Sequence, residues 1–105
     1  MGLTAFLIAC YQNHVECMKL LADAGCNTAA IDNNGTNALI YAACSGAAAA
    51  VRTVVDAGWC ELEAEDTHGN TAFLKACDKG NVECMNLLAE AVSYTHLTLP
   101  TTPYV

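Results

Sequence analysis

The pattern of apolar and polar residues along this chain repeats. The seven residues TAFLIAC at 4–10 recur as TAFLKAC at 71–77, and HVECMKLLADA at 14–24 recurs as NVECMNLLAEA at 81–91. Both echoes have the same offset of 67 residues, and a more divergent copy lies between them. Self-similarity at a fixed spacing indicates a repeat architecture, in which one small structural unit is built several times.

Each repeat unit opens with a glycine and predicts two helices. Aligning the glycines gives lengths of 33 and 34 residues, and it divides the chain into units at residues 2–34, 35–68 and 69–91, the last of them truncated. A short polar side chain then precedes an apolar run, and such side chains accept hydrogen bonds from the first turn of a helix. These predicted N-caps are Thr4, Asn37 and Thr71.

A short first helix is predicted after each cap, and a longer second helix follows after a break. The first helices are expected at Ala5–Tyr11, Ala38–Ser45 and Ala72–Lys79. The second helices are expected at residues 15–24, 48–57 and 82–91. Gly25 and Gly58 supply the left-handed conformation that closes a helix. On each second helix the polar residues form one narrow stripe, so neighbouring helices must cover both flanks.

The segments between units carry turn signals, DNNG at 32–35 and DTHG at 66–69, which predict hairpin-like loop tips. A unit of loop tip, short helix, turn and longer helix with this period resembles the ankyrin repeat. The resemblance covers residues 2–91 and depends on the TAFL starts, the Ala-Gly helix ends and the Asp-x-x-Gly tips. It implies an all-α solenoid of stacked helix-turn-helix units. A tetratricopeptide array has a similar period but lacks these tips.

Two features depart from the family pattern. The family's T-P-L-H motif appears here as TAFL, NALI and TAFL, so the proline and the histidine that braces the tip are both missing. The middle unit carries one extra residue near 59–61 and smaller side chains, so we expect it to be the least well packed. The third unit has no unit after it to cover Leu87 and Leu88, which predicts marginal stability.

The last fourteen residues, VSYTHLTLPTTPYV at 92–105, match none of the units. Val92 stands where the first unit has its closing glycine, and valine is strained in a left-handed conformation. The segment has no charge and two prolines, and it resembles the translation of a transposase-type sequencing adapter. We therefore expect residues 1–91 to be an ankyrin-repeat fragment and residues 92–105 to be a non-native or disordered tail.

Charge and composition narrow the functions that fit. The chain has a net charge of −7 and only four cationic residues, a balance that repels phosphate backbones and argues against nucleic-acid binding. No run approaches the roughly 20 apolar residues that span a bilayer, and no secretory signal is present, so a cytoplasmic or nuclear protein without membrane contact is expected. Seven cysteines in such a chain favour reduced thiols.

Cys10, His14 and Cys17 have a spacing that lies on one face of a continuous helix and suggests a metal site. The predicted break at Asn13 removes that geometry, and the histidine returns as Asn81 although both cysteines return. We therefore interpret the cysteines as small buried packing residues and expect no metal. Because no base, phosphate loop or carboxylate pair accompanies them, we expect no catalytic residue, no cofactor and no enzyme activity.

The resemblance implies a monomeric protein–protein interaction scaffold that binds a partner protein through its concave face and loop tips. The acidic segment at 61–66 is interpreted first as a solvated loop, and the alternative is an electrostatic patch for a basic partner with salt-sensitive binding. The contact residues carried over from the family are Leu3, Tyr11, Gln12, Ile31, Asn33, Asn34, Thr36, Cys44, Ser45, Glu65, Thr67, His68, Asn70, Asp78 and Lys79, with Tyr11 and Ile31 as anchors. The alternative is a substrate-recruiting arm of a larger enzyme, such as a kinase or a ubiquitin ligase, whose catalytic domain is absent.

Overall fold

The computed structural model describes residues 4–97 of the chain. This part forms six helices joined by turns and two longer loops, and none of its residues is in a β-strand. The helices are α1 (Ala5–Tyr11), α2 (Val15–Asp23), α3 (Ala38–Ser45), α4 (Ala48–Ala57), α5 (Ala72–Lys79) and α6 (Val82–Leu97).

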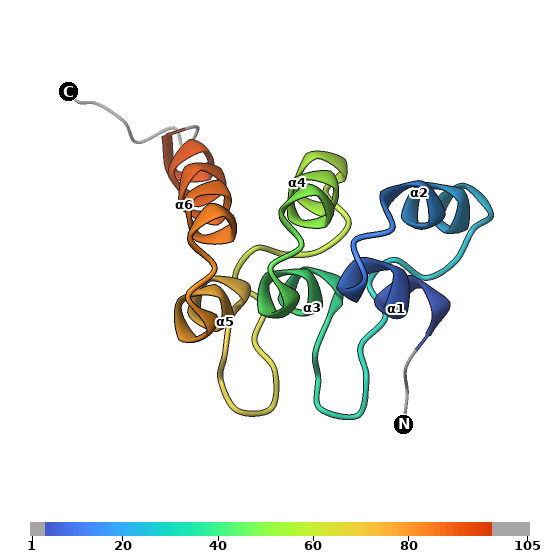
Figure 1. Ribbon diagram of the computed structural model, residues 1–105, viewed down its shortest axis with the longest axis horizontal. Coiled ribbons are helices and arrows are strands. Elements are labelled where there is room, and N and C mark those ends of the chain that lie inside the picture. Colours follow the sequence, from blue (N-terminus) through green and yellow to red (C-terminus); the bar gives the residue numbers. More distant parts are fainter. Residues whose placement is uncertain (1–3, 98–105) are drawn as a thin grey trace.

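The helices lie in two rows (Figure 1). The inner row consists of α1, α3 and α5, the outer row of α2, α4 and α6, and each inner helix contacts the outer helix of its own unit. Neighbouring helices are also in contact along each row. Both loop tips extend from the inner row on the side away from the outer row (Figure 1). The predicted all-α repeat solenoid is therefore confirmed.

The predicted caps start all three inner helices. Each cap side chain is in extended backbone and accepts a hydrogen bond from the N–H three residues later, which removes one unpaired donor from the first turn. The bonds run from Leu7 N to Thr4 Oγ1 (3.1 Å), from Ile40 N to Asn37 Oδ1 (2.9 Å) and from Leu74 N to Thr71 Oγ1 (3.2 Å). All three inner helices have the predicted bounds.

The outer helices differ from the prediction at two ends. Helix α2 ends at Asp23, one residue early, whereas α6 continues past the predicted end at Ala91 to Leu97. The expectation that the helix stops at Ala91 was wrong, because Val92 supplies no left-handed residue and the chain keeps its helical conformation. The rest of the predicted tail, residues 98–105, lies outside the described residues, and its adapter origin stays a prediction.

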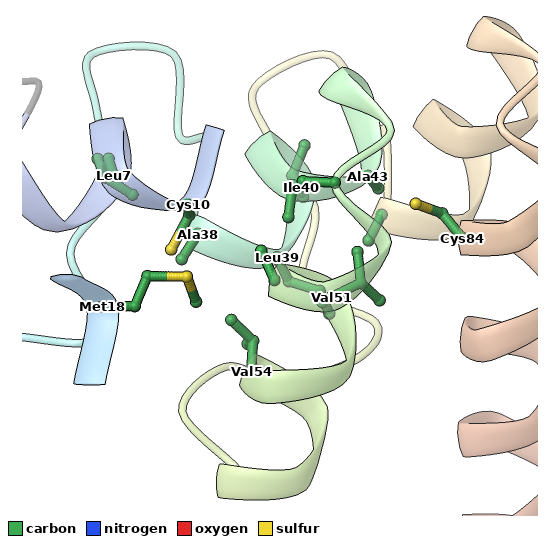
Figure 2. Packing of buried hydrophobic residues seen from close by; sticks show 14 of the residues in the cluster. Leu7, Cys10, Met18, Ala38, Leu39, Ile40, Ala43, Val51, Val54 and Cys84 are labelled. Carbon is green, nitrogen blue, oxygen red and sulfur yellow. The ribbon is translucent and has the colours of Figure 1, made fainter. Parts of the chain in front are cut away.

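The middle unit is the best buried of the three, contrary to the sequence-based expectation. It contributes nine of the eighteen buried apolar residues in the described part of the chain. Its small side chains let helices approach closely, and it has a neighbour on either side. Trp59 extends the same core. Its ring lies edge-on to that of Phe6, with the ring centroids 5.4 Å apart. Figure 2 shows Cys10, Met18 and Ala38 directed into the space between the first and middle units.

Candidate functional site

The first loop tip is built around Asp32. Its Oδ1 atom accepts hydrogen bonds from the backbone N–H groups of Asn34 (2.8 Å) and Thr36 (2.9 Å). The N–H of Gly35 donates to the Asp32 carbonyl at 3.0 Å, and Gly35 has a φ of 74°, which favours glycine. A turn followed by a left-handed glycine produces the hairpin-like tip that the sequence predicted.

The second tip repeats this arrangement around Asp66. Its Oδ1 atom accepts from the N–H groups of His68 (2.8 Å) and Asn70 (3.0 Å), and these bonds, led by the one from Asn70, lower the pKa of the carboxyl. The two tips are joined directly, because Thr67 N–H donates to the Asn34 carbonyl at 2.9 Å. The tips therefore form one hydrogen-bonded edge of the molecule.

Tyr41 of α3 ties the inner row to the first tip. Its hydroxyl donates to Asp32 Oδ2, and its ring lies edge-to-face with that of Tyr11, with centroids 5.9 Å apart. Burial and the neighbouring Asp32 raise the pKa of Tyr41 to about 12, so the phenol remains a donor at neutral pH. Burial acts to raise the pKa of Asp32, but the hydrogen bonds from Tyr41, Thr36 and Asn34 outweigh it and lower the pKa.

A small hollow opens where these aromatic residues meet. It has a volume of about 240 Å³ and is lined by Leu7, Ile8, Tyr11, Gln12 and Tyr41. Tyr11 is 46% exposed, so part of its side chain is accessible beside the hollow. The lining of the hollow is mainly apolar, and Gln12 and the two tyrosines carry the polar groups among the lining residues. This arrangement can accept one apolar side chain of a partner and hold it against the Tyr11 ring.

The family relationship is decided by comparison of both sequence and fold. A family model described as ankyrin repeats (3 copies) matches residues 1–66. The chain belongs to the ankyrin-repeat family. Its fold is also similar to the crystal structure of the human ASB11 ankyrin repeat domain, with a TM-score of 0.78 and 25% identity. The similarity covers 85% of this chain and 40% of that one. This ankyrin chain therefore spans less than half the length of that domain.

The contact residues expected from the ankyrin family are accessible wherever the structure describes them. Leu3 lies outside the described residues. Thr36, Cys44 and Asn70 are half-buried, and the other described members of the set are exposed. The two expected anchors lie in different places: Tyr11 borders the hollow on α1, whereas Ile31 lines a separate hollow of about 440 Å³ beside Trp59 and Cys60.

Leu7 and Ile8, which line the hollow, are absent from the predicted contact set, and so is Tyr41. In the first and third units its position is held by Ile8 and Lys75, so the repeat pattern shows no shared chemistry there. The available signal was a single tyrosine in an inner helix of otherwise small or aliphatic residues, close after the first tip. Tyrosine combines an apolar ring with a donor, and it here braces the tip in place of the missing histidine.

The seven cysteines of the ankyrin units divide into three groups, of which Cys26, Cys44 and Cys60 are half-buried. Cys10 and Cys84 are buried, as predicted, but Cys17 and Cys77 are exposed, so the expectation that all pack between helices was wrong for these two. Burial raises the pKa of Cys10 to about 12, with smaller effects from Cys60 and Cys26, which keeps it a thiol. Within residues 4–97, no group of His, Cys, Asp and Glu side chains is arranged to hold a metal, and no helix is long and apolar enough to cross a membrane.

Proposed function

We propose that this chain is a protein-interaction module that holds a partner segment against the inner helices and the loop tips. The observation that supports this best is the continuous path from the Tyr11 ring to the Tyr41 ring and on to the Asp32 carboxylate. This path fixes the hollow and the first tip relative to each other before any partner arrives. A surface that is ordered in advance loses less conformational entropy on binding.

The chemistry of this surface favours a partner segment with an apolar side chain flanked by basic residues. An exposed aromatic ring beside a hollow is the kind of feature that dominates binding energy. The exposed carboxylates of Glu65 on the second tip and Asp78 on α5 add negative charge, in a chain of net charge −7. Electrostatic attraction of this kind speeds encounter and weakens as salt is added.

A displayed library of random peptides tests this function and requires no identified partner. Peptides selected on the intact chain should share an apolar residue next to Lys or Arg, and their binding should weaken with added salt. Tyr11→Ala should reduce their affinity about 30-fold, since a central aromatic anchor contributes about 2 kcal/mol. Asn86→Ala, an exposed change on the outer helix α6 that leaves the net charge as it is, is the matched control and should leave affinity unchanged. Selected peptides that bind Tyr11→Ala as tightly as the intact chain would refute the proposal.

A further inference from the structure

Each end of the helix stack exposes an apolar face whose repeat counterparts are buried or half-buried inside the molecule. The N-terminal face is formed by the exposed residues Ala5, Ile8, Cys17 and Leu20 of the first unit. Leu20 is 67% exposed and Ile8 47% exposed. Together with neighbouring residues of α1 and α2, they line an apolar hollow of about 450 Å³.

The counterparts of these residues show what normally covers such a face. Cys17 is exposed, whereas Ala50 in the middle unit and Cys84 in the third are at most 1% exposed. Ala5 is likewise exposed, whereas its counterparts Ala38 and Ala72 are fully buried. In the middle and third units these positions are covered because the helices of the preceding unit pack against them.

The C-terminal face, on the third unit, is formed by Phe73, Leu74, Cys77, Val82 and Met85. The first four are exposed, with Leu74 at 49% and Val82 at 64%, and Met85 is half-buried. Residue for residue, this face is identical in side-chain type to the matching surface of the first unit, which consists, in the same order, of Phe6, Leu7, Cys10, Val15 and Met18. That first-unit surface is covered by the middle unit, and four of its five residues are at most 2% exposed.

The N-terminal face resembles the surface by which the middle unit covers the first unit. Helix α3 of the middle unit contacts α1 of the first, and two small residues of α3, Ala38 and Ala42, are fully buried. The N-terminal face has the same residue type at the same two positions, Ala5 and Ala9. It differs where Ile8, Cys17 and Leu20 stand in place of Tyr41, Ala50 and Thr53. These replacements keep the N-terminal face apolar, so it can receive the apolar side chains of a C-terminal face.

Polar groups at the unit boundary agree with this fit. The side-chain amide of Asn81 donates to the carbonyls of Ala43 (2.7 Å) and Cys44 (3.3 Å) at the end of the preceding inner helix. His14 holds the same position on the N-terminal face, and an imidazole N–H can donate to such carbonyls. At the other end, a Cβ added to Gly80 would meet nothing within 4 Å, so the end of α5 is open to a donor of this kind.

We propose that copies of this chain associate head to tail, the C-terminal face of one copy resting on the N-terminal face of the next. The occupant of each face is a second copy, because the covered surface of the first unit and the free surface of the third have the same side chains. Such a contact joins two different faces and leaves one face of each kind free in the pair, so further copies can add. The expectation of a monomer then holds only in dilute solution.

Sedimentation equilibrium of the whole chain tests this proposal. Because Cys17 and Cys77 are exposed, the measurement needs a thiol reductant to exclude disulfide-linked dimers. The weight-average mass should rise continuously above that of one chain between about 10 μM and about 1 mM, the range of weak, transient contacts. Added salt should strengthen association, since copies of net charge −7 repel one another. A constant single-chain mass over this range would overturn the proposal.

Two single substitutions determine which faces meet. Leu20→Glu disables the N-terminal face and Leu74→Glu the C-terminal face, and both side chains are exposed enough for the fold to be kept. Each variant alone should remain a monomer, whereas an equimolar mixture should form a one-to-one dimer and stop there. If only one of the substitutions abolishes association, one face pairs with itself and the head-to-tail arrangement is wrong.

Ile31→Glu is the matched control, because it places the same charge on a residue that is 58% exposed and lies on neither end face. Its self-association should equal that of the unchanged chain. Partner binding is separable by two readouts: it depends on Tyr11 and weakens with salt, whereas association depends on Leu20 and Leu74 and strengthens with salt. Either interaction can therefore fail in these experiments without the other.

Discussion

The first and third units have nearly the same sequence and opposite patterns of exposure. Phe6 is 2% exposed and Phe73 is 37% exposed, although both follow the same N-cap and alanine. On the other flank the order reverses, because Cys17 is exposed and Cys84 is buried. The same residue type in the same local structure is thus core or surface according to which neighbour it has. Whether a side chain of this protein is buried is therefore decided by the neighbouring unit rather than by the sequence of its own unit.

The largest effect that tests this comparison is the truncation of paired leucines. Leu7→Ala should lower the free energy of unfolding by about 3 kcal/mol, since it leaves a cavity at a fully buried site. Leu74→Ala should lower it by less than about 1 kcal/mol, because that side chain is 49% exposed. Urea unfolding of dilute protein, followed by circular dichroism, measures both. Equal losses would show that the third unit is covered in solution.

Thiol labelling sharpens the comparison at two pairs of positions. Cys17 and Cys77 should react with iodoacetamide in the native protein, whereas their repeat counterparts Cys84 and Cys10 should react about a hundredfold more slowly, for an opening free energy of about 3 kcal/mol. Burial also raises the pKa of both protected thiols, which lowers their thiolate fraction. Peptide mass spectrometry at successive times gives the four rates. Similar rates within either pair would contradict the structure.

The hydrogen bonds from the Asn81 side chain to the middle unit predict a smaller difference in unfolding free energy between paired positions. Asn81→Ala should cost about 1–2 kcal/mol of unfolding free energy, because two helix-end carbonyls lose their donor. His14→Ala, the same position in the first unit, should change it by less than about 0.5 kcal/mol, since His14 is exposed. Thermal unfolding of the two variants at low concentration makes the comparison. A loss at His14 as large as that at Asn81 would be unexpected.

The smallest effect concerns the two loop tips. The folded-state pKa values of Asp32 and Asp66 are lowered, so the stability they contribute is complete above the unfolded pKa of about 4 and is lost as pH falls through the folded values. Tyr41→Phe removes the hydroxyl bond to Asp32 and should reduce stability at neutral pH by less than about 1 kcal/mol, since the carboxylate is largely solvated. The variant should also lose less stability between pH 5 and pH 2 than the unchanged protein. Urea midpoints across that range would detect it.

Local signals predicted much of the fold. The caps at Thr4, Asn37 and Thr71 determine where the inner helices start, and the Asp-x-x-Gly segments form the tips as expected, because each depends on hydrogen bonds within a few residues. The prediction that the middle unit packs least well was wrong. In the sequence its small side chains suggested weak packing, but in the stacked fold they let neighbouring helices lie close together. The bond from Tyr41 to Asp32 was missed because the two residues belong to different elements that only the folded loop brings together.

By itself the sequence determined the repeat, the helices, the caps and the tips of this protein, because these follow from periodicity and from contacts between near neighbours in the chain. The tertiary structure alone decided which cysteines and leucines are buried, how Tyr41 braces the first tip, and which apolar faces remain uncovered at the two ends. Those properties depend on what lies across a boundary between units, and no single unit's sequence contains its neighbour.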